Sequence, residues 1–187
     1  LVRSRGLGDV YKRQLSESLQ MGVRVDKPGV RLTDYHTIGG GYATPALLTA
    51  EGKPKWSSGG PHTELSNRDY LADASFLVAL QGEAALIDQL AAALADPVWV
   101  VFLGRKSCPP ARPVFNGLGD YRDLEEALGE YDWQPRREDV DGRRAVIESA
   151  PDADGATRHR DHIVSRRFRL FQPRYTRTIS LRPPEVE

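Results

Sequence analysis

A basic loop with the sequence GRKS, at residues 104–107, is the stretch best suited to hold an anionic ligand. Gly104 permits a sharp turn or a close approach of the ligand to the backbone. Arg105 and Lys106 place two positive charges side by side, and three prolines between residues 109 and 113 stiffen the chain that follows. A stiff loop loses little conformational entropy on binding. The alternative is a proline-rich exit from a strand with two solvated cations.

Aromatic and basic residues are also interspersed through the polar, glycine-rich stretch from residue 26 to residue 69. They are Tyr35, His36, Tyr42, Lys53, Lys55, Trp56 and His62. Bases stack on aromatic rings and phosphates attract cations, so this composition is typical of an arm that lies along single-stranded nucleic acid. A mobile surface loop is the alternative. Within it, Asp34, Tyr35 and His36 offer a general base beside a tyrosine.

No other residues form a catalytic or metal-binding constellation in the sequence. P-loop, HExxH, GxSxG and dinucleotide-binding motifs are absent. His159 and His162 lie close in sequence, but no third ligand is placed to complete a metal site. Cys108 has no identifiable base, which favours a buried structural thiol or a small loop residue. We therefore predict neither a cofactor nor a metal.

Four segments around these residues have the periodicity of regular structure. Residues 19–26 and 73–81 alternate as half-buried strands, residues 83–95 form an amphipathic helix, and the apolar run at 98–103 is typical of a buried strand. Tight connections make the last three a βαβ crossover with parallel strands. The order strand, long insertion, strand, helix, strand matches the latter two-thirds of a ferredoxin-like βαββαβ fold that lacks its first strand and helix. We predict this partial α+β domain at residues 15–115.

The C-terminal part, residues 116–187, is predicted to be a smaller β-rich extension with two blocks of opposite charge. Residues 120–141 contain nine acidic side chains, with a short helix at 121–131. Residues 144–149 fit a strand, and residues 158–177 fit a strand or hairpin that carries seven arginines. A basic strand with interleaved aromatic residues can track a phosphate backbone. It can equally pair with the acidic block, and both interpretations stay open.

Composition excludes several classes of protein. The 187-residue chain is 40% hydrophobic and 28% charged with a formal net charge of zero, which is ordinary for a globular domain and gives no overall preference for nucleic acid. A single cysteine excludes an internal disulfide. No apolar run approaches the ~20 residues of a membrane span, and no secretory signal is recognisable, so we expect a cytoplasmic protein without a membrane partner. Residues 1–14 look like a translated sequencing adapter and are set aside as a non-native leader, the alternative being a disordered basic tail.

Four stretches, in the right order, resemble one known family. Residues 102–109, FLGRKSCP, are similar to the LGRRSCP loop of the type I-E branch of CRISPR-associated family five, the CasD family. LSESLQMGVRV at 15–25 resembles that family's second strand, LTDYHT at 32–37 its RDYHT segment, and NRDYLADASFLVAL at 67–80 its REYL, DASF and VAL block. Residues 158–171 are similar to its basic, aromatic C-terminal strand.

The resemblance implies a subunit of the Cascade surveillance complex, built on the RAMP variant of the ferredoxin-like fold. Members of the family hold the 5′ handle of the CRISPR RNA, adjoin the backbone subunit and the large subunit, and meet target DNA only indirectly. The insertion at about residues 26–69 corresponds to the family's thumb. The family's opening strand, glycine-containing loop and first helix have no counterpart here, which agrees with a truncated N-terminus and predicts poor stability of the isolated chain.

The resemblance also implies which residues bind RNA. The position equivalent to Arg68 lies at the base of the thumb, and the glycine-arginine loop follows an aromatic residue, here Phe102. Phe102 replaces the usual tyrosine and Lys106 the usual second arginine, so a hydroxyl and a bidentate fork are lost. The predicted RNA-binding residues are Tyr35, His36, Trp56, Arg68, Phe102, Gly104, Arg105, Lys106, Ser107 and Cys108, with Arg166, Arg167 and Arg169 as a second set.

Two other functions compete with that of an RNA-capping subunit that does not cleave RNA. Type I-C relatives in the same family cut precursor RNA without a metal, and in that case Tyr35 and His36 would be the catalytic residues. A protein-interaction module without RNA contact would instead use the acidic face at residues 120–141.

Overall fold

The computed structural model describes residues 15, 17–41, 46–133, 142–165 and 168–182. Its contacts divide the chain into two units, Lys27–Ser75 and the remainder, which consists of Leu1–Asp26 and Phe76–Glu187. The predicted leader at residues 1–14 lies outside the described residues.

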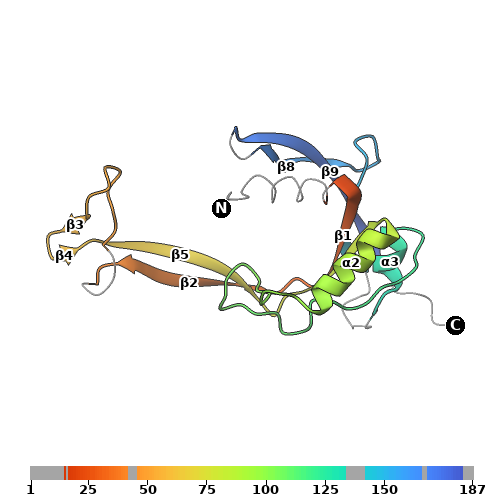
Figure 1. Cartoon of the computed structure of the whole chain (residues 1–187), viewed down its shortest axis with the longest axis horizontal. Coiled ribbons are helices and arrows are strands. Elements are labelled where there is room, and N and C mark those ends of the chain that lie inside the picture. Colours follow the sequence, from red (N-terminus) through yellow and green to blue (C-terminus); the bar gives the residue numbers. More distant parts are fainter. Residues whose placement is uncertain (1–14, 16, 42–45, 134–141, 166–167, 183–187) are drawn as a thin grey trace, which may run out of the picture. The chain divides into compact units, whose positions relative to one another are not determined.

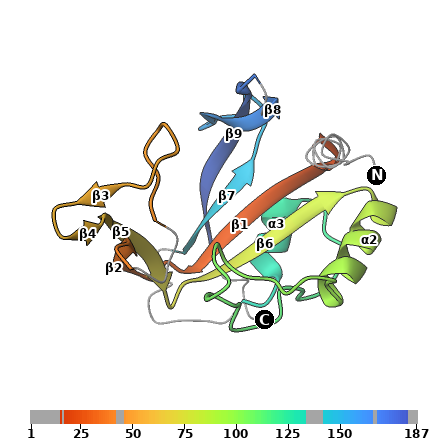
Figure 2. The same cartoon turned by 60° about the vertical axis from the view of Figure 1, so that its left-hand side comes forward.

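The larger unit is built on a five-stranded sheet in the order β6-β1-β7-β9-β8. The strands are β1 (Leu19–Lys27), β6 (Ser75–Gly82), β7 (Arg143–Glu148), β8 (Thr157–Ser165) and β9 (Leu170–Leu181). β7 pairs antiparallel with both β1 and β9, and β8 pairs antiparallel with β9. The arrows of β1 and β6 run in opposite directions in Figure 2. β6 is therefore an edge strand of an antiparallel sheet.

One short helix covers the core of this sheet. α3 (Leu124–Glu130) begins after Asp123, whose carboxylate accepts a hydrogen bond from the Glu126 backbone N–H at 2.9 Å, as an N-cap residue does. The longer helix, α2 (Ala84–Ala95), follows β6 and buries only Ala91. The buried core consists of Leu124, Leu128, Ala145, Ile147 and Leu181, with Leu77, Ala79, Trp133 and Ile179 packed around it.

Two buried arginines share Asp26, and one of them, Arg24, holds the C-terminal end of α3 to the sheet. Arg24 and Arg143 are 1% and 4% exposed, and both donate to Oδ1 of Asp26, at 2.7 and 2.8 Å. Arg24 Nη1 also donates to the carbonyl oxygens of Leu128 (2.5 Å) and Tyr131 (2.9 Å), which the end of a helix leaves without partners. These bonds offset the cost of burying the charge.

The smaller unit is a ribbon of two long strands, with a small hairpin at one end (Figure 1). β2 (Val30–Gly39) pairs antiparallel with β5 (Thr63–Ala72) over ten residue pairs, and β3 (Trp56–Ser57) pairs with β4 (Gly60–Pro61). Most side chains of β2 and β5 are exposed, on both faces of the ribbon. A two-stranded ribbon without a covering layer is marginally stable in water. Its exposed faces therefore do not contribute a core that would stabilise the fold.

The predicted strand at residues 98–103 is wrong. In the structure this segment is irregular, and Val98, Trp99 and Val100 are 91%, 83% and 85% exposed. The parallel crossover with residues 73–81 is wrong for the same reason, because the described neighbour of β6 is β1. An apolar run becomes a buried strand only when it pairs with another strand and is covered by an apolar face, and among the described residues no strand pairs with residues 98–103.

The remaining element predictions are confirmed within one to four residues. They correspond to β1, β6, α2, α3, β7 and the β8–β9 hairpin. Not all of the apolar side chains of β6 face the core. Phe76 and Val78 are 46% and 54% exposed, while Leu77 and Ala79 pack against the core. The chain is thus an α+β protein dominated by its sheets.

Candidate nucleic-acid interface

The pairing of β2 with β5 determines which predicted site residues share a face of the ribbon. Asp34 lies opposite Arg68, Tyr35 opposite Asn67 and His36 opposite Ser66. Successive side chains of a strand point to opposite faces, and directly opposed residues share a face. Arg68 and His36 therefore lie on one face of the ribbon, and Tyr35 lies on the other.

The face with Arg68 is charged. His36 Nε2 lies 2.5 Å from Asp34 Oδ2, and Arg68 is opposite that same carboxylate in the neighbouring strand. Arg68 and His36 are half-buried, whereas Tyr35, on the other face, is 62% exposed. One face presents Arg68 beside the His36–Asp34 pair. The other face presents the accessible ring of Tyr35 together with the Arg31–Asp69 ion pair.

A third group of side chains lies near the end of the ribbon. Glu64 accepts hydrogen bonds from Lys55 and, at 2.9 Å, from His62. The hydrogen bond from Lys55 is the main reason that the pKa of Glu64 lies below its ordinary value. Trp56 in β3 is 61% exposed, so its ring is available for stacking.

The basic loop at residues 102–108 belongs to the larger unit and closes on itself. The Leu103 N–H donates to the Cys108 carbonyl oxygen at 2.8 Å, and the Cys108 N–H donates to the Arg105 carbonyl oxygen at 2.9 Å. Gly104 has φ of 81°, a left-handed conformation that side chains with a Cβ rarely adopt. The loop is therefore a defined turn that needs glycine at its first corner. It exposes Phe102, Lys106 and Ser107 and half-buries Arg105 and Cys108.

The structure thus groups the predicted RNA-binding residues into two sets, one on the ribbon and one in the loop. Cys108 is half-buried, which makes it part of the turn and not a free surface thiol. Of the second set, Arg166 and Arg167 lie outside the described residues. Arg169 lies at the turn of the β8–β9 hairpin with φ of 48°. Sequence periodicity missed Arg24 and Arg143, because a charged residue in an alternating strand is normally assigned to the solvent.

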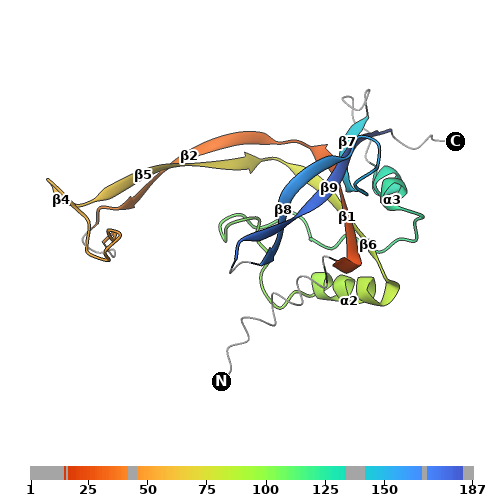
Figure 3. The same cartoon turned by 90° about the horizontal axis from the view of Figure 1, so that it is seen from above.

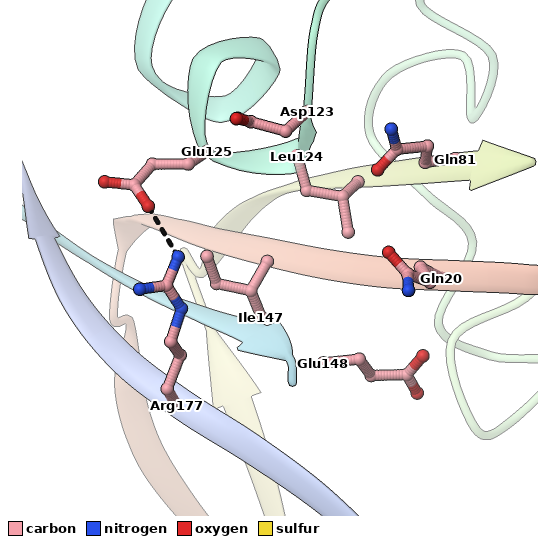
Figure 4. Close-up of a pocket in the computed structure, with 8 residues that line it drawn as sticks. All are labelled: Gln20, Gln81, Asp123, Leu124, Glu125, Ile147, Glu148 and Arg177. Atoms are coloured by element: carbon pink, nitrogen blue, oxygen red, sulfur yellow. Dashed lines mark hydrogen bonds and ion pairs between the residues drawn. The ribbon is translucent and has the colours of Figure 1, made fainter. Parts of the chain in front are cut away.

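A polar depression of about 150 Å³ lies between α3 and the sheet, and it contains none of the predicted site residues (Figure 4). It is lined by Gln20, Gln81, Asp123, Leu124, Glu125, Ile147, Glu148 and Arg177. Arg177 Nη2 is held by Glu125 at 2.7 Å, which leaves an excess of carboxylates. The depression is therefore unsuited to a phosphate. The Glu125–Arg177 pair also joins the acidic block to the basic hairpin, as one of the two interpretations predicted.

Among the residues that the structure describes, no three histidine, cysteine, aspartate or glutamate side chains are grouped to hold a metal ion. The described helices include none with the length and apolar character needed to cross a membrane.

Comparisons with known proteins agree on one family. The family model for the CRISPR-associated protein (Cas_Cas5) matches residues 4–180. The chain is 34% identical over 130 residues to the CRISPR system Cascade subunit CasD of Escherichia coli (strain K12); the match covers 63% of this chain and 53% of the relative, so the chain spans about half the length of that curated protein.

Two solved structures are similar to the chain. A chain of a CRISPR RNA-guided surveillance complex matches with a TM-score of 0.63 and 32% identity, covering 91% of this chain and 70% of its own length. A structure described as a Cas protein matches with a TM-score of 0.59 and 28% identity, covering 90% and 71%. These matches extend over nearly the whole chain, and the chain belongs to the family of the CRISPR-associated protein (Cas_Cas5).

Proposed function

We propose that the chain is a CRISPR RNA-binding subunit of a Cascade surveillance complex and that it holds the 5′ handle of the RNA. The observation that carries this proposal is the likeness to a chain of a CRISPR RNA-guided surveillance complex over 91% of this chain. The relative named as a Cascade subunit supports it. The partners would be the CRISPR RNA and the adjoining backbone and large subunits, with target DNA met only indirectly.

The β2–β5 ribbon supplies the first RNA contact. Its exposed faces offer a ring, Tyr35, and a charged row that contains Arg68. A single-stranded handle presents unstacked bases and phosphates, which proteins bind by stacking and by charge-assisted hydrogen bonds. Contact with RNA would also stabilise a ribbon that has no covering layer of its own. We infer that this ribbon is the thumb of the ferredoxin-like RAMP fold.

The loop at residues 102–108 supplies the second contact. Its two backbone hydrogen bonds fix the turn before any ligand arrives. Arg105 and Lys106 then meet a phosphate with little loss of conformational entropy, and Phe102, which is 42% exposed, offers a stacking surface beside them. Gly104, Ser107 and Cys108 contribute the shape of the turn.

Two alternatives receive less support. An endoribonuclease would have to use Tyr35 and His36 on one substrate bond, but these residues lie on opposite faces of the ribbon. A protein-interaction module without RNA contact would use the acidic face at residues 120–141. Part of that block is outside the described residues, and Glu125 is engaged with Arg177.

Binding to a labelled CRISPR RNA handle, measured as a function of KCl concentration, tests the proposal. Arg68→Ala and Arg105→Ala should each weaken binding several-fold and reduce the slope of log affinity against log salt by about 0.7. Arg112→Ala, an exposed arginine in the same proline-rich segment as the loop, is the matched control and should bind as the original chain does. Unchanged affinity in both test variants would favour the protein-interaction alternative, and cleavage of precursor RNA that is lost in His36→Ala would favour the nuclease.

A further inference from the structure

A row of three ring-bearing side chains on β9 lies in neither of the two contacts described above. Phe171, Pro173 and Tyr175 alternate along β9 and therefore point to one face of the β8–β9 hairpin. Ile163 lies opposite Phe171, and Arg158 lies opposite Tyr175, so both extend the same face. Phe171 and Ile163 are each 46% exposed. Pro173 is also exposed and Tyr175 is half-buried, so the row is apolar and mostly exposed, with the exposed cation of Arg158 at one end.

Unpaired cations surround this row. Among the residues that the structure describes, the side chains of Arg158, Arg160 and Arg169 have no ion-pair partner, whereas Arg174 is held by Asp161 at 2.6 Å. Arg160 belongs to a bulged stretch of β8 between His159 and His162. Bulges bend a strand and redirect its side chains, and they often accompany binding surfaces. Arg158 and Arg160 are both exposed.

We propose that the face bearing Phe171, Pro173 and Tyr175 binds a single nucleic-acid strand without regard to its sequence. Alternate residues of a strand are about 7 Å apart, a distance that an extended single strand can match with consecutive bases. The rings then stack on the bases, and Arg158, Arg160 and Arg169 attract the phosphates. Stacking on aromatic and apolar rings tolerates every base, because every base has a π-face.

This surface goes beyond the proposed function, because it needs neither the ribbon nor the basic loop and does not require the 5′ handle. It lies at the opposite edge of the sheet from β6, on strands that β7 anchors to the core through six residue pairs with β9. A protein partner with an apolar surface is the competing occupant of the same face. The two occupants differ in what they require from residue 171: a nucleic acid needs a ring, and a protein needs only apolar volume.

Fluorescence anisotropy with the full chain and an oligothymidine of about 20 nucleotides tests the proposal, since this probe contains no repeat sequence. Phe171→Ala and Phe171→Leu should each weaken binding about tenfold, while Phe171→Trp should retain it. Phe76→Ala is the matched control, because Phe76 is also 46% exposed but lies on β6; it should leave binding unchanged. Circular dichroism and thermal melts establish that each variant is folded.

Charge is tested in the same assay. Arg158→Ala combined with Arg160→Ala should lower the slope of log affinity against log KCl by about 1.4, or about 0.7 for each lost phosphate contact. Arg112→Ala, an exposed arginine outside both proposed RNA contacts, is the matched charge control and should leave oligothymidine binding intact. The proposal is overturned if the chain does not bind the probe at about 50 mM KCl, if Phe171→Leu binds as tightly as the original chain, or if Phe76→Ala weakens binding as much as Phe171→Ala does.

Discussion

Tyr35 and His36 are adjacent in the chain, yet they lie on opposite faces of the β2–β5 ribbon, opposite Asn67 and Ser66 respectively. A catalytic pair must reach the same substrate bond, within hydrogen-bond distance of the reacting atoms. Two side chains separated by the thickness of a strand do not meet that condition. The two residues are therefore better suited to different ligand groups, with Tyr35 stacking and His36 paired to Asp34.

Substitutions at Tyr35 test this division. Tyr35→Ala should weaken binding of the handle about tenfold, because it removes the aromatic ring on which a base stacks. Tyr35→Phe keeps that ring and should keep most of the affinity. Neither variant should change the amount of precursor RNA cut in a gel assay. A cleavage rate that falls in both Tyr35→Phe and His36→Ala would contradict the separation of the two faces.

The glycines at positions 104 and 129 should respond in opposite ways to the same substitution. A Cβ at either position meets no atom within 4 Å, so steric overlap is excluded in both cases. Gly104→Ala should destabilise the loop by about 1 kcal/mol, because φ of 81° disfavours any residue with a Cβ. Gly129→Ala, in the last turn of α3, should stabilise the chain by up to about 0.5 kcal/mol. Urea unfolding measures both, and a handle-binding assay should be affected only by Gly104→Ala.

Leu128 and Val100 provide a test of where the core lies. Leu128, on the face of α3 that packs against the sheet, is fully buried, so Leu128→Ala should cost about 2–5 kcal/mol of unfolding free energy. Val100 is 85% exposed, so Val100→Thr should change that free energy by less than about 0.5 kcal/mol. Denaturant unfolding of the two variants decides between the observed core and one built around a strand at residues 98–103. A large loss in Val100→Thr would restore the buried strand that the sequence predicted.

The N-cap of α3 should make stability depend on pH in the acid range. The pKa of Asp123 lies below its ordinary value of 3.8, chiefly because the Glu126 backbone N–H donates to the carboxylate, and Arg122 adds to the effect. A lowered folded-state pKa means that the stabilisation is present above the unfolded value and is lost as the pH falls through the folded one. The unfolding temperature should therefore drop below about pH 4.

Asp123→Asn is the control for that pH effect. An asparagine amide accepts the same hydrogen bond at every pH. The variant should therefore lose less stability than the original chain does when the pH falls from about 5 to about 3. Asp123→Ala should be less stable than either at neutral pH. Parallel acid profiles for the original chain and Asp123→Asn would show that other carboxylates cause the loss.

Sequence periodicity identified the elements that are apolar on one side only. α2 was visible because its leucines and alanines recur at helical spacing, and β7 because Ala145, Val146 and Ile147 form a short apolar run. The β2–β5 ribbon was not recognised as two long strands, since both of its faces are exposed and no apolar period marks it. Apolar periodicity reflects the burial of one face, so a ribbon with two exposed faces has no such pattern in its sequence.

The candidate site depended on a different kind of information. The turn at residues 102–108 could be predicted from glycine, prolines and charge, because these residues restrict the backbone locally. The placement of Tyr35 and His36 on opposite faces could not be predicted in this way, because it depends on both residues lying in a regular strand. The burial of Arg24 was equally invisible, because it depends on carbonyl oxygens more than a hundred residues later in the chain.

That last contact has a consequence for synthesis. β1 is placed early in the chain, but its neighbour β7 begins at Arg143, and β7 is in turn secured by β9, which ends at Leu181. On the ribosome, β1 can pair with β6 early, but its other edge stays open until β7 and β9 have emerged. Until then Arg24 stays hydrated and the apolar side of β6 is open to collision with other nascent chains, so the demand for chaperones should persist until β9 has been translated.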